Sequence, residues 1–444
     1  MRLYLILLMM GAVLAASADY ELTDFLKQHR GDMWSMNQSG FGNIFFKAAP
    51  FIPTDQSREE LRYALSNRRG MLRLDEMTVF EALAAFGDDK TLDRLTVTVF
   101  NRGDGGHWGQ ENVTYSIDKI TALLKEYYPE VKPVPDYYNM SGQKIHALNW
   151  KTPDAFYQLK WSMSGSKSAP FCEYFILNIS KEDIAGIREA IKVTVTDKAD
   201  LRDNIRTDKP GYRYLDIAMV DQGNKGYCVV AVLERILRYY GSEADQHQLA
   251  QLTNTEVSGT TRDDMLEAIR KADNRLGIRM RELYSDNSFY KPNDFLKMVD
   301  DYNKTARKAR RKTINPDDYK RVRGNYYHYE IGNLMKQMEA DLFVQSRGRE
   351  RREVNKFIEN IKKNVDTGVP LGWCVLLGLV PEKQKNPQAG GGHMRLIIGY
   401  NDAAQELVFT DSWGLGHEFK TMSYSDAWAM TTWLGVLLPR TAAR

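Results

Sequence analysis

The chain has 444 residues, with 61 lysines and arginines against 58 aspartates and glutamates. This near balance of charge argues against a dedicated nucleic-acid-binding protein. The length is comfortable for two domains. No long apolar stretch follows the first residues, so the sequence predicts no membrane anchor.

The first 18 residues have the features of a signal peptide. Arg2 gives a short basic start, residues 3–14 are apolar apart from Gly11, and Ala16-Ser17-Ala18 is a cleavage site of small residues. The apolar run is too short to cross a bilayer and a polar segment follows it. The sequence therefore predicts an exported protein, periplasmic or extracellular after removal of residues 1–18.

The N-terminal region, residues 19–195, is predicted to be a separate α+β domain. Its predicted strands include residues 95–100 and 173–179, and its predicted helices include residues 117–128 and 181–191. A charged linker, residues 196–213, follows and contains the structure-breaking Lys209-Pro210-Gly211. The sequence leaves open whether this region is a removable pro-domain or a permanent accessory domain.

The C-terminal region, residues 214–444, shows helices first and strands second. Predicted helices cover residues 228–240, 243–252 and 261–276, and predicted strands cover residues 371–379, 393–400, 407–410 and 433–438. This order predicts an α+β fold with a helical subdomain and an antiparallel β subdomain. Residues 290–365 are predicted as a charged helical insertion. Its basic run 304–312 is interpreted as a solvated helix face, with a surface that contacts a polyanion or a membrane as the alternative.

The chain has three cysteines, Cys172, Cys228 and Cys374. An odd number in an exported protein leaves at least one thiol unpaired. Cys374 lies in an apolar run that is typical of a buried strand, where a free cysteine packs as a small hydrophobic residue. A Cys172–Cys374 disulfide is an alternative that no other feature of the sequence favours.

Residues 222–228 place Cys228 at the start of a predicted helix. A thiolate is the reactive form of cysteine, and the helix dipole stabilises negative charge at this end. Gly223 and Gly226 allow a tight turn before the helix. Gln222 lies six residues before the cysteine, where its side-chain amide, with the backbone N–H of Cys228, is placed to stabilise an oxyanion.

A nucleophilic thiol also needs a base and a group that orients the base. His393 follows three glycines and opens a mostly apolar strand, so it is the best candidate for the base. Asp411 comes 18 residues later and is the candidate orienting group, with Trp413 positioned to shield their contact from water. His417 follows a Gly-Leu-Gly turn and is a weaker alternative base.

Each of these residues also has a purely structural interpretation. Cys228 is alternatively a buried structural thiol, His393 a strand cap, Asp411 a turn residue, and Gln222 a helix cap or a partner of the loop backbone. His247, in the predicted helix 243–252, is interpreted as a surface or subdomain-packing residue.

The order Gln222, Cys228, His393 and then Asp411-Ser412-Trp413-Gly414 resembles the papain-like cysteine peptidase superfamily. Aspartate in third place, together with the residues around Cys228 and His393, is more similar to the bacterial C39-like branch. Val229 stands where papain itself has tryptophan. The resemblance covers residues 214–438 and does not extend to residues 19–195.

The resemblance implies a secreted cysteine peptidase acting on a peptide or protein substrate. In it, Cys228 is the nucleophile, His393 the general base and acid, Asp411 the orienting residue and Gln222 the oxyanion-hole donor. Such thiol chemistry requires no metal or organic cofactor, so none is expected. Two alternatives stay open: an amidase or acyltransferase on the same scaffold, and a papain-like binding protein without activity. The sequence predicts neither the substrate preference nor the oligomeric state.

Overall fold

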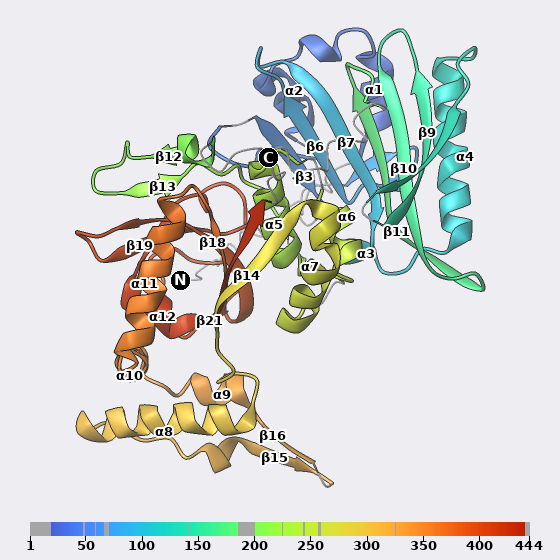
Figure 1. Ribbon diagram of the computed structural model, residues 1–444. Helices are drawn as coiled ribbons and strands as arrows, with labels where there is room; N and C mark the ends of the chain where they lie inside the picture. Colours follow the sequence, from blue (N-terminus) through green and yellow to red (C-terminus); the bar gives the residue numbers. More distant parts are fainter. Residues whose placement is uncertain are drawn as a thin grey trace, which may run out of the picture.

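The computed structural model describes residues 19–47, 49–57, 59–65, 71–140, 142–184, 200–223, 225–242, 245–255, 259–324 and 326–439. The predicted signal peptide and most of the predicted helix 181–191 lie outside these residues. The described residues form a mixed α+β structure with mainly antiparallel sheets (Figure 1). None of the described helices is long and apolar enough to cross a membrane.

An eight-stranded antiparallel sheet, the N-terminal sheet, dominates the first part of the chain. Its order is β2-β3-β6-β7-β11-β10-β9-β8, which combines hairpins with two longer connections, from β3 to β6 and from β7 to β8. The strands are β2 (Ile52–Pro53), β3 (Glu60–Ala64), β6 (Glu81–Phe86), β7 (Leu92–Asn101), β8 (Val134–Met140), β9 (Gln143–Lys151), β10 (Phe156–Ser166) and β11 (Ala169–Ser180). A smaller sheet contains β1 (Tyr20–Glu21), β4 (Leu72–Leu74) and β5 (Met77–Thr78).

The helices α1 (Leu22–Gln28), α2 (Gln38–Phe45) and α4 (Gln110–Tyr127) cover the N-terminal sheet (Figure 1). The short helix α3 (Arg102–Gly105) directly follows β7 at the end of the sheet. The helix predicted from residue 117 begins at Gln110 in the structure. Its start is set by Asn112, whose side chain accepts the N–H of Gly109 at 3.1 Å. This satisfies a group that would otherwise be unpaired next to the helix end. The polar first turn carries no apolar periodicity, so the sequence pattern missed it.

A second sheet, the C-terminal sheet, has the order β12-β13-β18-β17-β21-β14, with β19 beside β18 and β20 beside β19. Its strands are β12 (Ile205–Arg206), β13 (Arg213–Leu215), β14 (Ile278–Ser285), β17 (Leu371–Leu377), β18 (Gly391–Asn401), β19 (Glu406–Thr410), β20 (Lys420–Ser423) and β21 (Thr431–Pro439). The helices that accompany it are α5 (Cys228–Tyr239), α6 (Gln246–Leu252), α7 (Arg262–Leu276), α11 (Arg351–Val365) and α12 (Tyr424–Met430).

The structure corrects the expected separation of helices and strands in one place. Strand β14 follows α7 directly, within the predicted helical half, and pairs antiparallel with β21 at the sheet edge. Of its eight residues only Ile278 is buried. An edge strand with arginines and a glutamate facing solvent has no apolar run that would reveal it.

The predicted helical insertion also contains a β-hairpin. Helices α8 (Pro292–Lys308), α9 (Ile331–Met335) and α10 (Ala340–Arg347) pack around a cluster that includes Phe295 and Phe343. Strands β15 (Lys320–Arg323) and β16 (Tyr326–Tyr329) form the hairpin. Figure 1 shows α8, α9 and the hairpin at one end of the molecule, away from the N-terminal sheet.

All three cysteines are free thiols. Cys172 lies on β11 of the N-terminal sheet and Cys374 on β17 of the C-terminal sheet. The alternative of a disulfide between them is therefore wrong. Both thiols are buried among apolar side chains, where burial raises their pKa and keeps them protonated.

Two facing glycines make room for a buried indole in the C-terminal sheet. Gly372 on β17 pairs with Gly435 on β21, and the ring of Trp433 lies against both positions. We expect Gly435→Ala to lower the free energy of unfolding by about 1–3 kcal/mol, because its methyl group would overlap this ring. Urea unfolding measures the loss. Gly332→Ala is the matched control, since no atom lies near its Cβ position; equal midpoints for both variants would contradict the prediction.

Candidate functional site

Cys228 is the first residue of α5, which lies between the N-terminal and C-terminal sheets in Figure 1. The helix is almost entirely buried, so its register is fixed by packing on several sides. At its first residue the backbone N–H groups point outward without partners inside the helix. The structure therefore presents the half-buried thiol of Cys228 in a field that favours a thiolate.

His393, on β18, lies between Cys228 and Asp411. Its Nε2 atom is 3.1 Å from Oδ1 of Asp411, and its ring stacks on Trp413 with 4.2 Å between centroids and 8° between planes. Its Nδ1 atom is buried and has no hydrogen-bond partner among the described residues. The Cys228 thiol is near enough to the imidazole for the pKa of each group to be shifted by the other.

The surroundings of Cys228 and His393 favour a charged pair. Burial raises the pKa of the Cys228 thiol, but the hydrogen bond and charge of His393, with the backbone N–H groups of Met394 and Val229, lower it overall. Burial lowers the pKa of His393, but hydrogen bonds to Asp411 and Cys228 raise it overall. The two shifts stabilise thiolate and imidazolium together.

Asp411 is fully buried just after β19 and is held by three cationic or titratable partners. Its Oδ1 accepts from Arg395 Nε at 2.7 Å as well as from His393, and its Oδ2 accepts from Lys420 Nζ at 2.7 Å. Burial raises the pKa of this carboxyl group, but Arg395, His393 and Lys420 hold it well below its ordinary value. Asp411 is therefore ionised where it meets the imidazole.

A second carboxylate completes this buried group of charges. Glu382 accepts two hydrogen bonds of 2.9 Å from Arg395 Nη2 and one of 3.4 Å from Lys420 Nζ. Two carboxylates thus face two permanent cations, which balances the charge beside His393. The sequence analysis missed Glu382, Arg395 and Lys420. An arginine two residues after His393 in an apolar strand was the available signal, because alternate residues share a face.

Gln222 lies in the loop before α5, here called the catalytic loop (residues 221–223 and 225–228). Its backbone N–H donates to Ser412 O at 2.8 Å, which ties the loop to the residue after Asp411. Its buried side-chain Nε2 donates to Lys225 O at 3.1 Å. Gly223 has φ +70°, a conformation that a side chain would strain. The structure therefore brings Gln222 to the Cys228 end of the site.

His417 lies beside Asp411 and not beside the thiol. Its Nδ1 is 4.0 Å from Asp411 Oδ2, and its ring meets the edge of Trp413. Burial lowers its pKa, so it is held neutral. His393 contacts both Cys228 and Asp411, which makes it the better placed of the two histidines. His247 is buried close to Glu81, so the interpretation of a surface residue is wrong and that of a packing residue stands.

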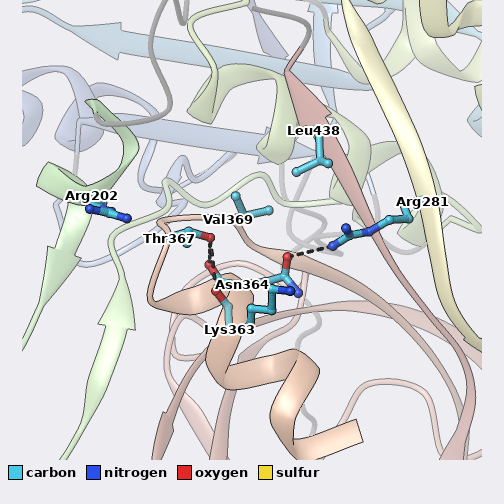
Figure 2. A pocket seen from close by; sticks show the side chains of 7 residues that line it. All are labelled: Arg202, Arg281, Lys363, Asn364, Thr367, Val369 and Leu438. Atoms are coloured by element: carbon cyan, nitrogen blue, oxygen red, sulfur yellow. Dashed lines mark hydrogen bonds between the residues drawn. The ribbon is translucent and has the colours of Figure 1, made fainter. Parts of the chain in front are cut away.

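A separate cavity of about 350 Å³ lies at the opposite end of β17 from His393. Figure 2 shows its lining, in which Arg281 reaches Asn364. The lining residues are Arg202, Arg281, Lys363, Asn364, Thr367, Val369 and Leu438. Its charge is positive, and none of the four candidate site residues contributes to it.

A thiol, an imidazole and a carboxylate close together are the side-chain types that cysteine-dependent hydrolases use. The model of the Peptidase_C39 like family matches residues 214–435, half of the 444-residue chain. The chain belongs to this family. The membership points to a cysteine peptidase and agrees with the resemblance seen in the sequence.

One solved structure with similarity to the chain is the peptidase domain of Streptococcus ComA, a bi-functional ABC transporter involved in a quorum sensing pathway. The two are 17% identical, and the match covers 50% of this chain and 97% of that one, with a TM-score of 0.25. No curated protein matches the chain.

The pKa shifts predict how the thiol reacts with pH. We expect iodoacetamide to alkylate Cys228 already at a pH below the ordinary pKa of cysteine, because the pKa of this thiol is lowered. His393→Ala removes the hydrogen bond and charge but leaves the burial. The pKa of Cys228 then rises, and the increase of rate with pH moves to higher pH. Mass spectrometry of the alkylated peptide gives both profiles, and Cys374→Ala should leave the wild-type profile unchanged. Coincident profiles for wild type and His393→Ala would contradict the assignment.

The buried charges around Asp411 predict a large stability effect. We expect Arg395→Met to lower the free energy of unfolding by about 3–5 kcal/mol at neutral pH, because it leaves two buried carboxylates with one cation. Arg213→Met is the control, since the Arg213–Asp366 pair is substantially exposed and worth less than about 1 kcal/mol. Urea unfolding measures the free energy of unfolding of both variants. Similar losses would contradict the prediction, because the Asp411 group would then contribute no more stability than a surface ion pair.

Proposed function

We propose that this protein is an exported cysteine peptidase that hydrolyses peptide bonds with Cys228, His393, Asp411 and Gln222. One observation supports the proposal: His393 is held by Asp411 through Nε2, its Nδ1 has no partner among the described residues, and the nearby Cys228 helps to raise its pKa. Family membership supports the same reaction class. Export rests on the first 18 residues of the sequence.

In the proposed acylation step, the Cys228 thiolate attacks the carbonyl carbon of the substrate and forms a C–S bond. The carbonyl electron pair moves to oxygen, and the oxyanion accepts hydrogen bonds from the Cys228 backbone N–H and the Gln222 side-chain amide. The amide then turns partly from Lys225 O or uses its second hydrogen. His393 gives its proton to the amine nitrogen, the C–N bond breaks and the amine leaves.

In the proposed deacylation step, neutral His393 takes a proton from water, and the resulting hydroxide attacks the thioester. The C–S bond breaks, the acid product leaves and the thiolate–imidazolium pair returns. Asp411 holds the ring in the orientation that aims one nitrogen at the sulfur. Trp413 stacks on the ring and covers the His393–Asp411 contact, which keeps that hydrogen bond strong.

The test uses the full chain without residues 1–18 and a library of fluorogenic peptides. We expect wild type to cleave a subset of them and Cys228→Ala to lose at least about 10³-fold in kcat/KM, because the nucleophile is removed. Cys172→Ala is the matched control and should keep wild-type activity. The same samples are offered an amine acceptor and non-peptide amides.

Three outcomes distinguish the alternatives. Peptide cleavage that depends on Cys228 supports the proposal. Transfer to the amine, or hydrolysis of non-peptide amides alone, would favour an acyltransferase or amidase. No reaction at Cys228 with any acyl substrate, in a folded protein, would favour a binding protein and sink the peptidase assignment.

A further inference from the structure

A buried group of charges joins the N-terminal sheet to the catalytic loop. Its N-terminal members, here called the clamp, are Arg62 on β3, Glu81 on β6 and Asp104 on α3. Its members in the catalytic loop are Asp221 and Lys225, which stand on either side of Gln222. Residues more than a hundred positions apart therefore meet next to the proposed oxyanion-hole donor.

Glu81 is the centre of this group and is 2% exposed. Its Oε2 accepts from Arg62 Nη2 at 2.7 Å and from Lys225 Nζ at 3.3 Å, and its Oε1 accepts from Gln246 Nε2 at 3.3 Å. Burial raises the pKa of Glu81, but Arg62, Lys225 and His247 hold it well below its ordinary value. The Glu81 carboxylate is ionised, and Lys225 of the catalytic loop supplies part of the positive charge that offsets the cost of burying it.

The clamp holds the catalytic loop at two points, Asp221 and Lys225. Asp221 Oδ2 accepts from Arg62 Nη1 at 3.0 Å, and Lys225 Nζ donates to Asp104 Oδ2 at 2.8 Å. The carbonyl of the same Lys225 accepts the Gln222 side-chain amide. A shift of Lys225 would therefore carry the orientation of Gln222 with it.

Tight packing reinforces these ion pairs. A side chain at Gly223 would come within 2.8 Å of Arg62 Nη2, and one at Gly103 would overlap the ring of Tyr227. Tyr227, directly before Cys228, is buried and donates to Asn101 Oδ1 at 3.4 Å. The glycines let the two parts of the chain approach closely enough to exclude water from the charges.

The thiol and imidazole are held differently. Cys228 is fixed by α5 and His393 by β18, Asp411 and Trp413. Among the described residues, no hydrogen bond or ion pair connects the N-terminal sheet to Cys228, His393 or Asp411. The clamp therefore acts on the loop that carries Gln222 and leaves the Cys228–His393 pair to other elements.

We propose that Arg62, Glu81 and Asp104 are positioning residues that fix the catalytic loop in its oxyanion-binding conformation. The N-terminal sheet is then a permanent part of the active enzyme and not a removable inhibitor. This inference rests on the proposed peptidase function. It predicts that breaking the clamp slows the acylation chemistry without changing the reactivity of the thiol itself.

The experiment compares Glu81→Gln and Lys225→Met with wild type in the full chain, using a fluorogenic peptide that wild type cleaves. We expect kcat to fall about 10- to 100-fold, because a catalytic group misplaced by about 1 Å costs rates of this order. KM should change less than about threefold, and the pH profile of iodoacetamide alkylation should stay that of wild type. Lys225→Arg, which keeps the charge, should recover most of the lost kcat.

Lys160→Met is the matched control. Lys160 on β10 pairs with Asp245 before α6 at 2.9 Å, so it crosses between the same two parts of the chain without contacting the catalytic loop. We expect it to lower the melting temperature but to keep wild-type kcat. Asp104→Asn, at a partly exposed site, is a milder clamp variant for use if the buried changes prevent folding, and should lower kcat several-fold.

The outcomes separate this inference from the proposed function. Wild-type kcat in folded Glu81→Gln, Lys225→Met or Asp104→Asn would overturn the clamp while leaving the peptidase assignment intact. An equal loss of kcat in Lys160→Met would also overturn it, because the effect would then follow general stability. A wild-type chain that cleaves no peptide would overturn both.

Discussion

The carboxylate of Asp411 is the interaction on which the candidate site depends. It is fully buried and shared among His393, Arg395 and Lys420, with Glu382 closing the group. A lone buried carboxylate beside an imidazole would be costly and would bind its proton too tightly. Here two cations lower that cost and leave a rigid acceptor. The Asp411 carboxylate orients the His393 ring, and the His393 ring in turn influences the protonation state of the Cys228 thiol.

The site is assembled from two directions. Strand β18 carries His393, Asp411 directly follows β19, and α5 begins with Cys228 at a helix start where negative charge is stabilised. The catalytic loop, which precedes α5 and contacts the N-terminal sheet, contains Gln222. On either side of Gln222, Asp221 forms an ion pair with Arg62 and Lys225 forms one with Glu81 of that sheet. The N-terminal sheet therefore contacts the loop next to the candidate site directly.

Much of the C-terminal fold and its family could be predicted from the sequence. The helix from Cys228, the strand from His393 and the spacing to Asp411 follow from periodicity and from residues whose chemistry is specific, and the family match agrees with them. Strand β14 and the β15–β16 hairpin were missed, because edge strands with charged residues lack an apolar pattern. The open choice of a Cys172–Cys374 disulfide was decided only by placement on different sheets.

The sequence by itself determined the order of the candidate residues for thiol chemistry. A few short motifs contain these residues, so the information is local. Only the tertiary structure determined the electrostatic environment of these residues. Arg395 and Lys420 reach Asp411, and Arg62 and Glu81 reach the catalytic loop, across separations that no local pattern encodes. A buried charge interacts with the groups that the fold places within a few ångströms of it. The cations near Asp411 and the catalytic loop could therefore be identified only from the tertiary structure.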